Sequence, residues 1–205
     1  MIALFNFDKN VKIKNISPGE GDTHRSGKST SIVYLNNGKK LVYKPRSGEL
    51  DQVFNILLDE INSANIGVDF QTINLLNKTT HSWVEFVYQL PVDEENQIEN
   101  YFKRCGALIG LAYWVMGFDL HFENIIAHGE YPILIDLECM FKSDDAQFDV
   151  LSIGLVPQLF AVQDTFFDCS GLGADGKGET IPYWQWINLN TDQLDLIKQS
   201  TNFRD

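Results

Sequence analysis

The stretch that most constrains this chain is residues 118–138, where polar side chains stand between apolar segments. It reads Phe-Asp-Leu-His-Phe-Glu-Asn-Ile-Ile-Ala-His-Gly-Glu-Tyr-Pro-Ile-Leu-Ile-Asp-Leu-Glu. The apolar residues on either side of His128-Gly129-Glu130 predict two short strands joined by a turn. A strongly apolar helix is predicted just before it, over residues 100–116. A polar loop and the end of a strand are therefore expected to form one site.

Five polar side chains of this stretch are the candidate functional residues: Asp119, His121, Asn124, Asp136 and Glu138. Phosphoryl transfer needs a group that positions or deprotonates the attacking hydroxyl, and oxygen ligands for Mg²⁺. The order Asp-x-His-x-x-Asn, with an Asp at the end of a following strand, supplies these groups as phosphoinositide-type kinases do. Taken one at a time, the same residues could simply cap turns, end a strand or hydrogen-bond within a loop.

The composition indicates an ordinary soluble globular protein. The 205 residues are 44% hydrophobic and 21% charged, and the formal net charge of −12 argues against non-specific binding to nucleic acid. No apolar run is long enough to cross a bilayer and the first residues do not resemble a signal peptide, so a cytoplasmic protein is expected. Cys105, Cys139 and Cys169 are widely spaced, which predicts reduced thiols rather than disulfides or a zinc site.

The first 90 residues predict an antiparallel sheet. Strands are expected over residues 11–16, 29–35, 40–46, 70–76 and 83–88, with a turn at Asn36-Asn37-Gly38 and a small-residue loop over residues 17–27. Lys44 stands on the third strand, where a kinase has the lysine that contacts the nucleotide phosphates. Arg46 is on the same face of that strand, because strand side chains alternate, and it strengthens the prediction of an anion site.

A helix is predicted over residues 50–63, in the position of the kinase helix whose glutamate pairs with the third-strand lysine. Either Glu49 or Glu60 could supply that carboxylate, and the pattern does not choose between them. A competing interpretation is a Walker A loop, since Gly27-Lys28-Ser29 resembles its end. Five residues separate Gly21 from Gly27 instead of four, however, and a strand follows instead of a helix.

The composition changes from β-branched to helical near residues 89–91, where adenine is expected to stack against backbone. This change predicts an N-lobe over residues 1–90, with the phosphate loop and the nucleotide lysine, and a partial C-lobe over residues 91–205. The second lobe would contain the catalytic loop and the metal-binding aspartate. Because the helix over residues 100–116 is apolar nearly all round, we expect it to be buried. The predicted fold class is α+β, a two-lobed arrangement like that of protein and lipid kinases with an incomplete C-lobe.

Several motifs in one order resemble the dehydratase domain of the class II lanthipeptide synthetases (LanM type). The matching segments are residues 21–24, 41–46, 83–86, 119–127, 135–138, 154–157 and 170–173. The resemblance implies a kinase-like enzyme that uses ATP and Mg²⁺ to phosphorylate Ser and Thr of a ribosomal precursor peptide, which consists of a leader and a Ser/Thr-rich core. Such enzymes then eliminate the phosphate to give dehydroalanine and dehydrobutyrine.

The resemblance also implies roles for individual residues. Lys44 would contact the nucleotide phosphates, with Arg46 beside it, and Asp119 and His121 would orient or deprotonate the substrate hydroxyl. Asn124 and Asp136 would hold Mg²⁺, with Glu138 as a supporting carboxylate. Asp22 and His24, in the loop over the phosphates, would serve phosphate handling or elimination, which needs a base and groups that stabilise the leaving phosphate.

Length is the departure from the family. Full members are several times longer, and the Arg and Thr of their elimination step, like their zinc cyclase domain, lie downstream of the matched region. The chain is therefore expected to be a fragment or a small relative, with the remaining synthetase domains as possible partners. Two alternatives remain open: an inactive remnant that binds a precursor peptide or a partner synthetase chain, and a kinase for a small molecule.

Overall fold

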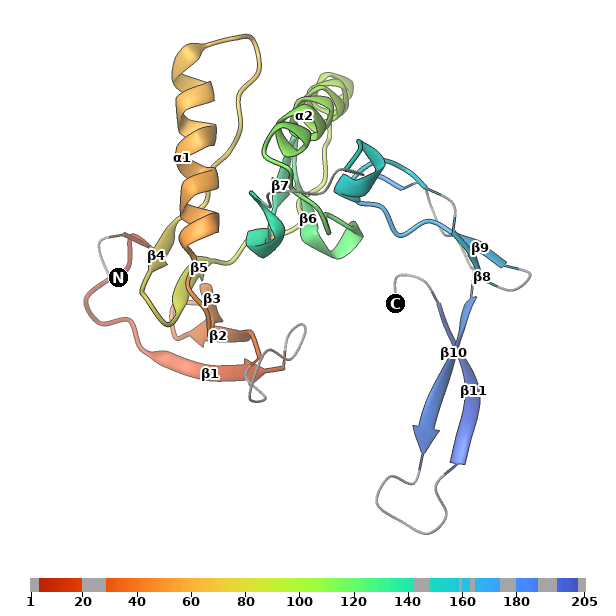
Figure 1. The fold of residues 1–205 in the computed structure, drawn as a ribbon. Coiled ribbons are helices and arrows are strands. Elements are labelled where there is room, and N and C mark those ends of the chain that lie inside the picture. Colours follow the sequence, from red (N-terminus) through yellow and green to blue (C-terminus); the bar gives the residue numbers. More distant parts are fainter. Residues whose placement is uncertain are drawn as a thin grey trace.

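The chain folds around a five-stranded antiparallel sheet, two long helices and a series of β-hairpins (Figure 1). The computed structural model describes residues 4–19, 29–141, 148–158, 160–162, 165–173, 180–187 and 195–202. Within these ranges no helix combines the length and the apolar character needed to cross a membrane. No disulfide joins the three cysteines, all of which lie in described ranges, and Cys105 is buried.

The sheet has the strand order β1-β2-β3-β5-β4. Its strands are β1 (Ile13–Pro18), β2 (Ser31–Leu35), β3 (Lys40–Lys44), β4 (Leu75–Asn77) and β5 (Ser82–Glu85). The predicted turn joins β2 to β3, with Gly38 at φ 83°, a conformation that glycine adopts without strain. β4 is shorter than the predicted residues 70–76, and β5 ends before residue 88.

The two helices differ in how they bury their apolar residues. α1 (Glu49–Ala64) follows β3 and precedes β4 in the sequence. It buries Asp51, Phe54 and Leu58 along one stripe. α2 (Glu95–Trp114) begins earlier than predicted, because Glu94 and Gln97 form a reciprocal capping box.

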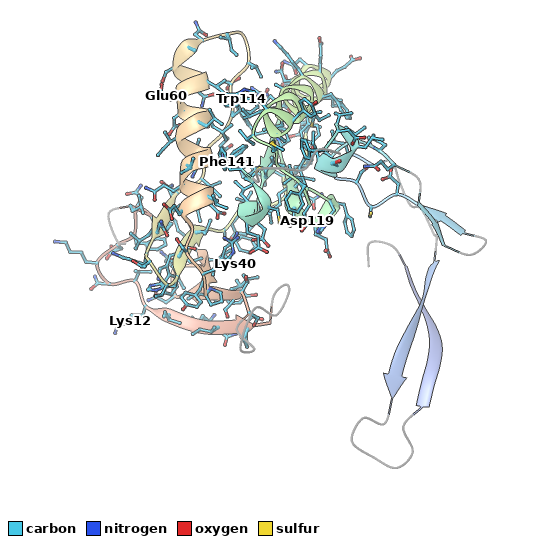
Figure 2. The ribbon with its side chains drawn as sticks, viewed as in Figure 1. Lys12, Lys40, Glu60, Trp114, Asp119 and Phe141 are labelled. Carbon is cyan, nitrogen blue, oxygen red and sulfur yellow. The ribbon has the colours of Figure 1, made fainter. Side chains whose placement is uncertain are left out.

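The prediction that α2 is buried on all sides is wrong. Its buried residues, Arg104, Cys105, Leu108 and Ala112, share one face. On the rest of its surface Phe102 is 62% exposed and Trp114 is 72% exposed. Trp114 is labelled in Figure 2. β7 and the short helix η3 (Leu151–Ile153) contact α2, and its buried face belongs to the same cluster as Phe54 and Leu58 of α1. The apolar composition of the helix exceeds what these neighbours cover.

The polar loop after α2 leads into the predicted hairpin of β6 (Ile125–His128) and β7 (Tyr131–Leu134). The short helices η1 (Phe122–Asn124) and η2 (Leu137–Cys139) flank this hairpin. Two further hairpins follow: β8 (Phe160–Val162) with β9 (Thr165–Phe167), and β10 (Thr180–Ile187) with β11 (Asp195–Asn202). In Figure 1 the β10–β11 hairpin stands apart from the sheet and the helices.

The larger hydrophobic core crosses the predicted boundary at residue 90. Phe54, Leu58 and Phe70, which precede the boundary, pack in one buried cluster with Leu108 of α2 and Leu134 of β7. A smaller cluster around Val33 and Leu41 covers one face of the sheet. α1 thus packs against the part of the chain that follows it, and this packing brings the end of β3 to the end of the β6–β7 hairpin.

Candidate functional site

Lys44 and Arg46 meet the acidic residues that follow β7, although 92 positions separate Lys44 from Asp136 in the sequence. Lys44 Nζ lies 3.3 Å from Asp136 Oδ1, and the Nη2 of Arg46 donates to the same oxygen. Arg46 Nε lies 3.2 Å from Glu138 Oε2. The structure therefore brings four of the predicted site residues into one ion-pair cluster.

The fifth member of the cluster is Asp51, in the first turn of α1. Its Oδ1 lies 3.3 Å from Lys44 Nζ and its Oδ2 lies 3.2 Å from Arg46 Nη1. The Asp51 side chain is only 3% exposed, so its charge is stabilised by these two cations and by the positive end of the helix dipole. Asp51 therefore holds both basic side chains in place from α1.

The prediction that Glu49 or Glu60 pairs with Lys44 is wrong, because Asp51 takes that position. Glu49 is exposed, and Glu60 is exposed near the end of α1 that points away from the sheet (Figure 2). The sequence did contain a signal for Asp51. It stands three residues before Phe54 and seven before Leu58, which places its carboxylate on the buried stripe of α1.

Asn124 and Asp136 lie at the same end of the β6–β7 hairpin. The Ile135 N–H donates to the Asn124 carbonyl at 2.9 Å, just beyond the pairing of Ile125 with Leu134. Asp136 has φ 58° and ψ 55°, a left-handed conformation that Asp adopts more readily than most residues. This conformation ends the strand and leaves the Asp136 side chain within reach of Lys44 and Arg46.

The loop that carries Asp119 and His121 is fixed through the backbone of alternate residues. The N–H groups of Phe118, Leu120 and Phe122 donate to the carbonyls of Cys139, Ile153 and Cys169, respectively. Leu120 is 1% exposed, whereas the Asp119 side chain is 59% exposed and the His121 side chain is 30% exposed. The loop thus buries one apolar residue and holds the two polar side chains at the surface of the site.

Three of the loop's polar residues contact one another. The Nδ2 of Asn124 donates to the Asp119 carbonyl at 2.8 Å and lies 3.2 Å from the Nε2 of His121. The Nε2 of His121 is also 3.9 Å from Asp119 Oδ1. Both close contacts of Asn124 involve Nδ2, so its amide oxygen is the atom that can serve a cation.

The cluster shifts the pKa values of two of its members. Burial alone would raise the pKa of Asp136, but the charges of Lys44 and Arg46 outweigh burial and hold it below its ordinary value. Burial likewise opposes the charge of Arg46, but Asp51 and Asp136 raise the pKa of its guanidinium. Both groups are therefore held in their charged forms.

An apolar cavity of about 220 Å³ opens beside this cluster. Ile32, Val42 and Val84 of the sheet line it, together with Ile126 and Ile135. Lys44 and Asp51 are among its charged lining residues. Residues 85–87, at the end of β5 and just after it, also line the cavity.

The donor set of the predicted magnesium site consists of oxygen atoms. Over the described parts of the chain, no group of three or more His, Cys, Asp or Glu side chains could hold a metal ion by itself. The side chains of Asp136 and Glu138 are 40% and 39% exposed. With the amide oxygen of Asn124, they are oxygen donors of the kind that Mg²⁺ prefers.

Two predicted site residues, Asp22 and His24, lie outside the described residues, in the interval 20–28.

Two comparisons relate the chain to known proteins. A family model described as "Domain of unknown function (DUF4135)" matches residues 1–205. The protein named "Lacticin 481/lactococcin biosynthesis protein LcnDR2", from Lactococcus lactis subsp. lactis, is 38% identical over 131 residues, which are 60% of this chain and 14% of that protein. The chain therefore spans only a small part of the length of this relative.

Proposed function

The chain belongs to the DUF4135 family, and from this premise we propose that it phosphorylates Ser and Thr of a ribosomal lanthipeptide precursor with ATP. The predicted resemblance to the class II lanthipeptide synthetases is confirmed by the match to the lacticin 481 biosynthesis protein. Phosphorylation is the first half of dehydration to dehydroalanine and dehydrobutyrine. The proposal includes the kinase-like, two-lobed arrangement as the framework of the site.

One observation carries the proposal: the ion pair between Lys44 and Asp136 at 3.3 Å. A kinase needs a strand lysine for the nucleotide phosphates and an aspartate for the metal on opposite sides of one cleft. Here the lysine and the aspartate come from distant parts of the sequence, and the lysine also lines the cavity that contains Val42 and Ile126. The apolar residues of this cavity suit an adenine ring, and Lys44 suits the phosphates.

In this proposal the loop residues act on the acceptor hydroxyl. The Asp119 carboxylate is exposed on the loop before the β6–β7 hairpin and would accept or orient the hydroxyl proton of the substrate. His121, 3.9 Å from that carboxylate, would position it. Asn124, Asp136 and Glu138 would hold Mg²⁺, which neutralises the charge of the phosphates and aligns the transferred group.

A groove of about 720 Å³ favours a peptide acceptor over a small molecule. It shares Phe86 and Ile126 with the apolar cavity and continues along Tyr88, Tyr101 and Phe122. Phe122 follows the loop histidine directly, so a chain that lies in this groove would pass the site of transfer.

Mass spectrometry of a Ser/Thr-rich precursor incubated with the protein, ATP and Mg²⁺ tests the proposal. Gain of phosphate is the expected result, and loss of water would mean that elimination also occurs. Asp119→Asn should abolish the phosphate gain while the fold is retained. An unchanged precursor would contradict the proposal and favour a module that only binds the peptide. ADP release that does not depend on the peptide would favour a small-molecule kinase.

A further inference from the structure

The guanidinium of Arg46 contacts three carboxylates at once. Its Nη1 donates to Asp51 Oδ2 at 3.2 Å, its Nη2 donates to Asp136 Oδ1, and its Nε lies 3.2 Å from Glu138 Oε2. Nη1 also lies 3.3 Å from the Ser47 carbonyl. All three guanidinium nitrogens are thus engaged, and the side chain is only 17% exposed.

Two of these carboxylates, Asp136 and Glu138, are the ones that the proposed function gives to the metal. Asp136 Oδ1 already accepts from Lys44 as well as from Arg46. A divalent cation binds carboxylate oxygens at about 2.0–2.1 Å, so it would stand next to the guanidinium and repel it. The metal and the present position of Arg46 compete for the same oxygens.

Arg46 can substitute for a divalent cation between the carboxylates better than Lys44 can. Its planar fork spans Asp136 and Glu138 together, whereas an ammonium is a compact point charge. In the cluster the two cations face three carboxylates, which leaves one excess negative charge. Without a guanidinium or a metal, Asp136 and Glu138 would repel each other in a partly buried site.

We propose that Arg46 is a placeholder cation, which holds Asp136 and Glu138 in the metal-free protein and releases them when a divalent cation binds. Asp51 is the fixed partner in this exchange, because it is buried and belongs to α1. Once released from Asp136, the guanidinium stays beside Asp51. The inference rests on the proposed function for the assignment of the metal ligands, but it concerns metal affinity and needs no turnover.

Titration of the chain with Mn²⁺ alone, without nucleotide, tests the exchange. Free Mn²⁺ is measured by electron paramagnetic resonance and binding by calorimetry. Arg46→Gln should raise the affinity for Mn²⁺ about fivefold or more, because a competing positive charge beside the ligands is gone. Lys12→Gln, which removes an exposed lysine, is the matched control and should leave the affinity unchanged. Asp136→Asn should weaken binding in both backgrounds.

An unchanged or lower Mn²⁺ affinity in Arg46→Gln would overturn the inference, because a residue that only binds phosphate does not compete with the metal. Equal binding in the wild type and in Asp136→Asn would overturn it as well. Should Arg46→Gln fail to fold, Arg46→Lys is the second variant, which keeps the charge but removes the planar guanidinium. Arg46→Lys should raise the Mn²⁺ affinity about twofold, and no rise would count against the exchange. A rise in the Mn²⁺ affinity of Arg46→Gln, together with no peptide phosphorylation by the wild type, would contradict the proposed function but still support the exchange.

Discussion

Replacing Asp51 with Asn tests whether a buried carboxylate holds the basic side chains of the site together. Asn keeps the shape of the side chain but removes the charge that faces Lys44 and Arg46. Both cations are largely buried, with side-chain exposures of 8% and 17%. After the change they share Asp136, and Arg46 also keeps Glu138; the side chains of these two carboxylates are 40% and 39% exposed. The buried positive charge is then balanced only by carboxylates that water also reaches.

The expected loss of stability follows from the contacts. At 3.3 Å and an effective dielectric constant of about 20, each pair attracts by roughly 5 kcal/mol before desolvation is subtracted. Breaking a buried pair at one partner costs about 3–5 kcal/mol. Because Asp136 remains as a second partner of both cations, we expect Asp51→Asn to lower the free energy of unfolding by about 2–3 kcal/mol.

Urea denaturation followed by circular dichroism measures this change. Glu49→Gln is the matched control, since it removes an exposed carboxylate from the same turn of α1 and should alter stability by less than about 0.5 kcal/mol. Asp51→Asn should also weaken binding of a fluorescent ATP analogue, because Lys44 loses its anchor. Equal stabilities for the two variants would show that the buried carboxylate does not hold the cluster, and the argument for its role would fail.

Two further predictions concern parts of the fold outside the cluster. A hydrogen bond from Arg104 holds the pKa of Asp69 below its ordinary value, so this carboxylate stabilises the fold above about pH 4 and loses its contribution as the pH falls further. Asp69→Asn should therefore flatten the fall in thermal midpoint between about pH 5 and 3, and an unchanged slope would refute this. Gly154 has φ 85°, and an added Cβ would lie 3.0 Å from the backbone nitrogen of Leu120, so Gly154→Ala should cost about 1–3 kcal/mol in urea denaturation. Gly67→Ala, at φ 87° with nothing within 4 Å of the added Cβ, shows the strain alone, and an equal cost in both variants would refute the close approach.

Local patterns in the sequence predicted most of the secondary structure around the site. Alternation and turn residues located β2, β3 and the hairpin of β6 and β7, because strand period and turn chemistry act over a few neighbouring residues. The same alternation placed Lys44 and Arg46 on one side of the chain. Pattern failed for α2, where apolar composition alone could not show which face its neighbours cover.

What the sequence determined by itself is the set of chemical groups and the short elements that carry them. The tertiary structure alone decided that Asp51 pairs with Lys44, and that Arg46 lies on Asp136 and Glu138. These contacts depend on how the buried stripe of α1 packs against α2 and β7, far along the chain. Packing of this kind sums many weak apolar contacts between distant segments, and no local period encodes it.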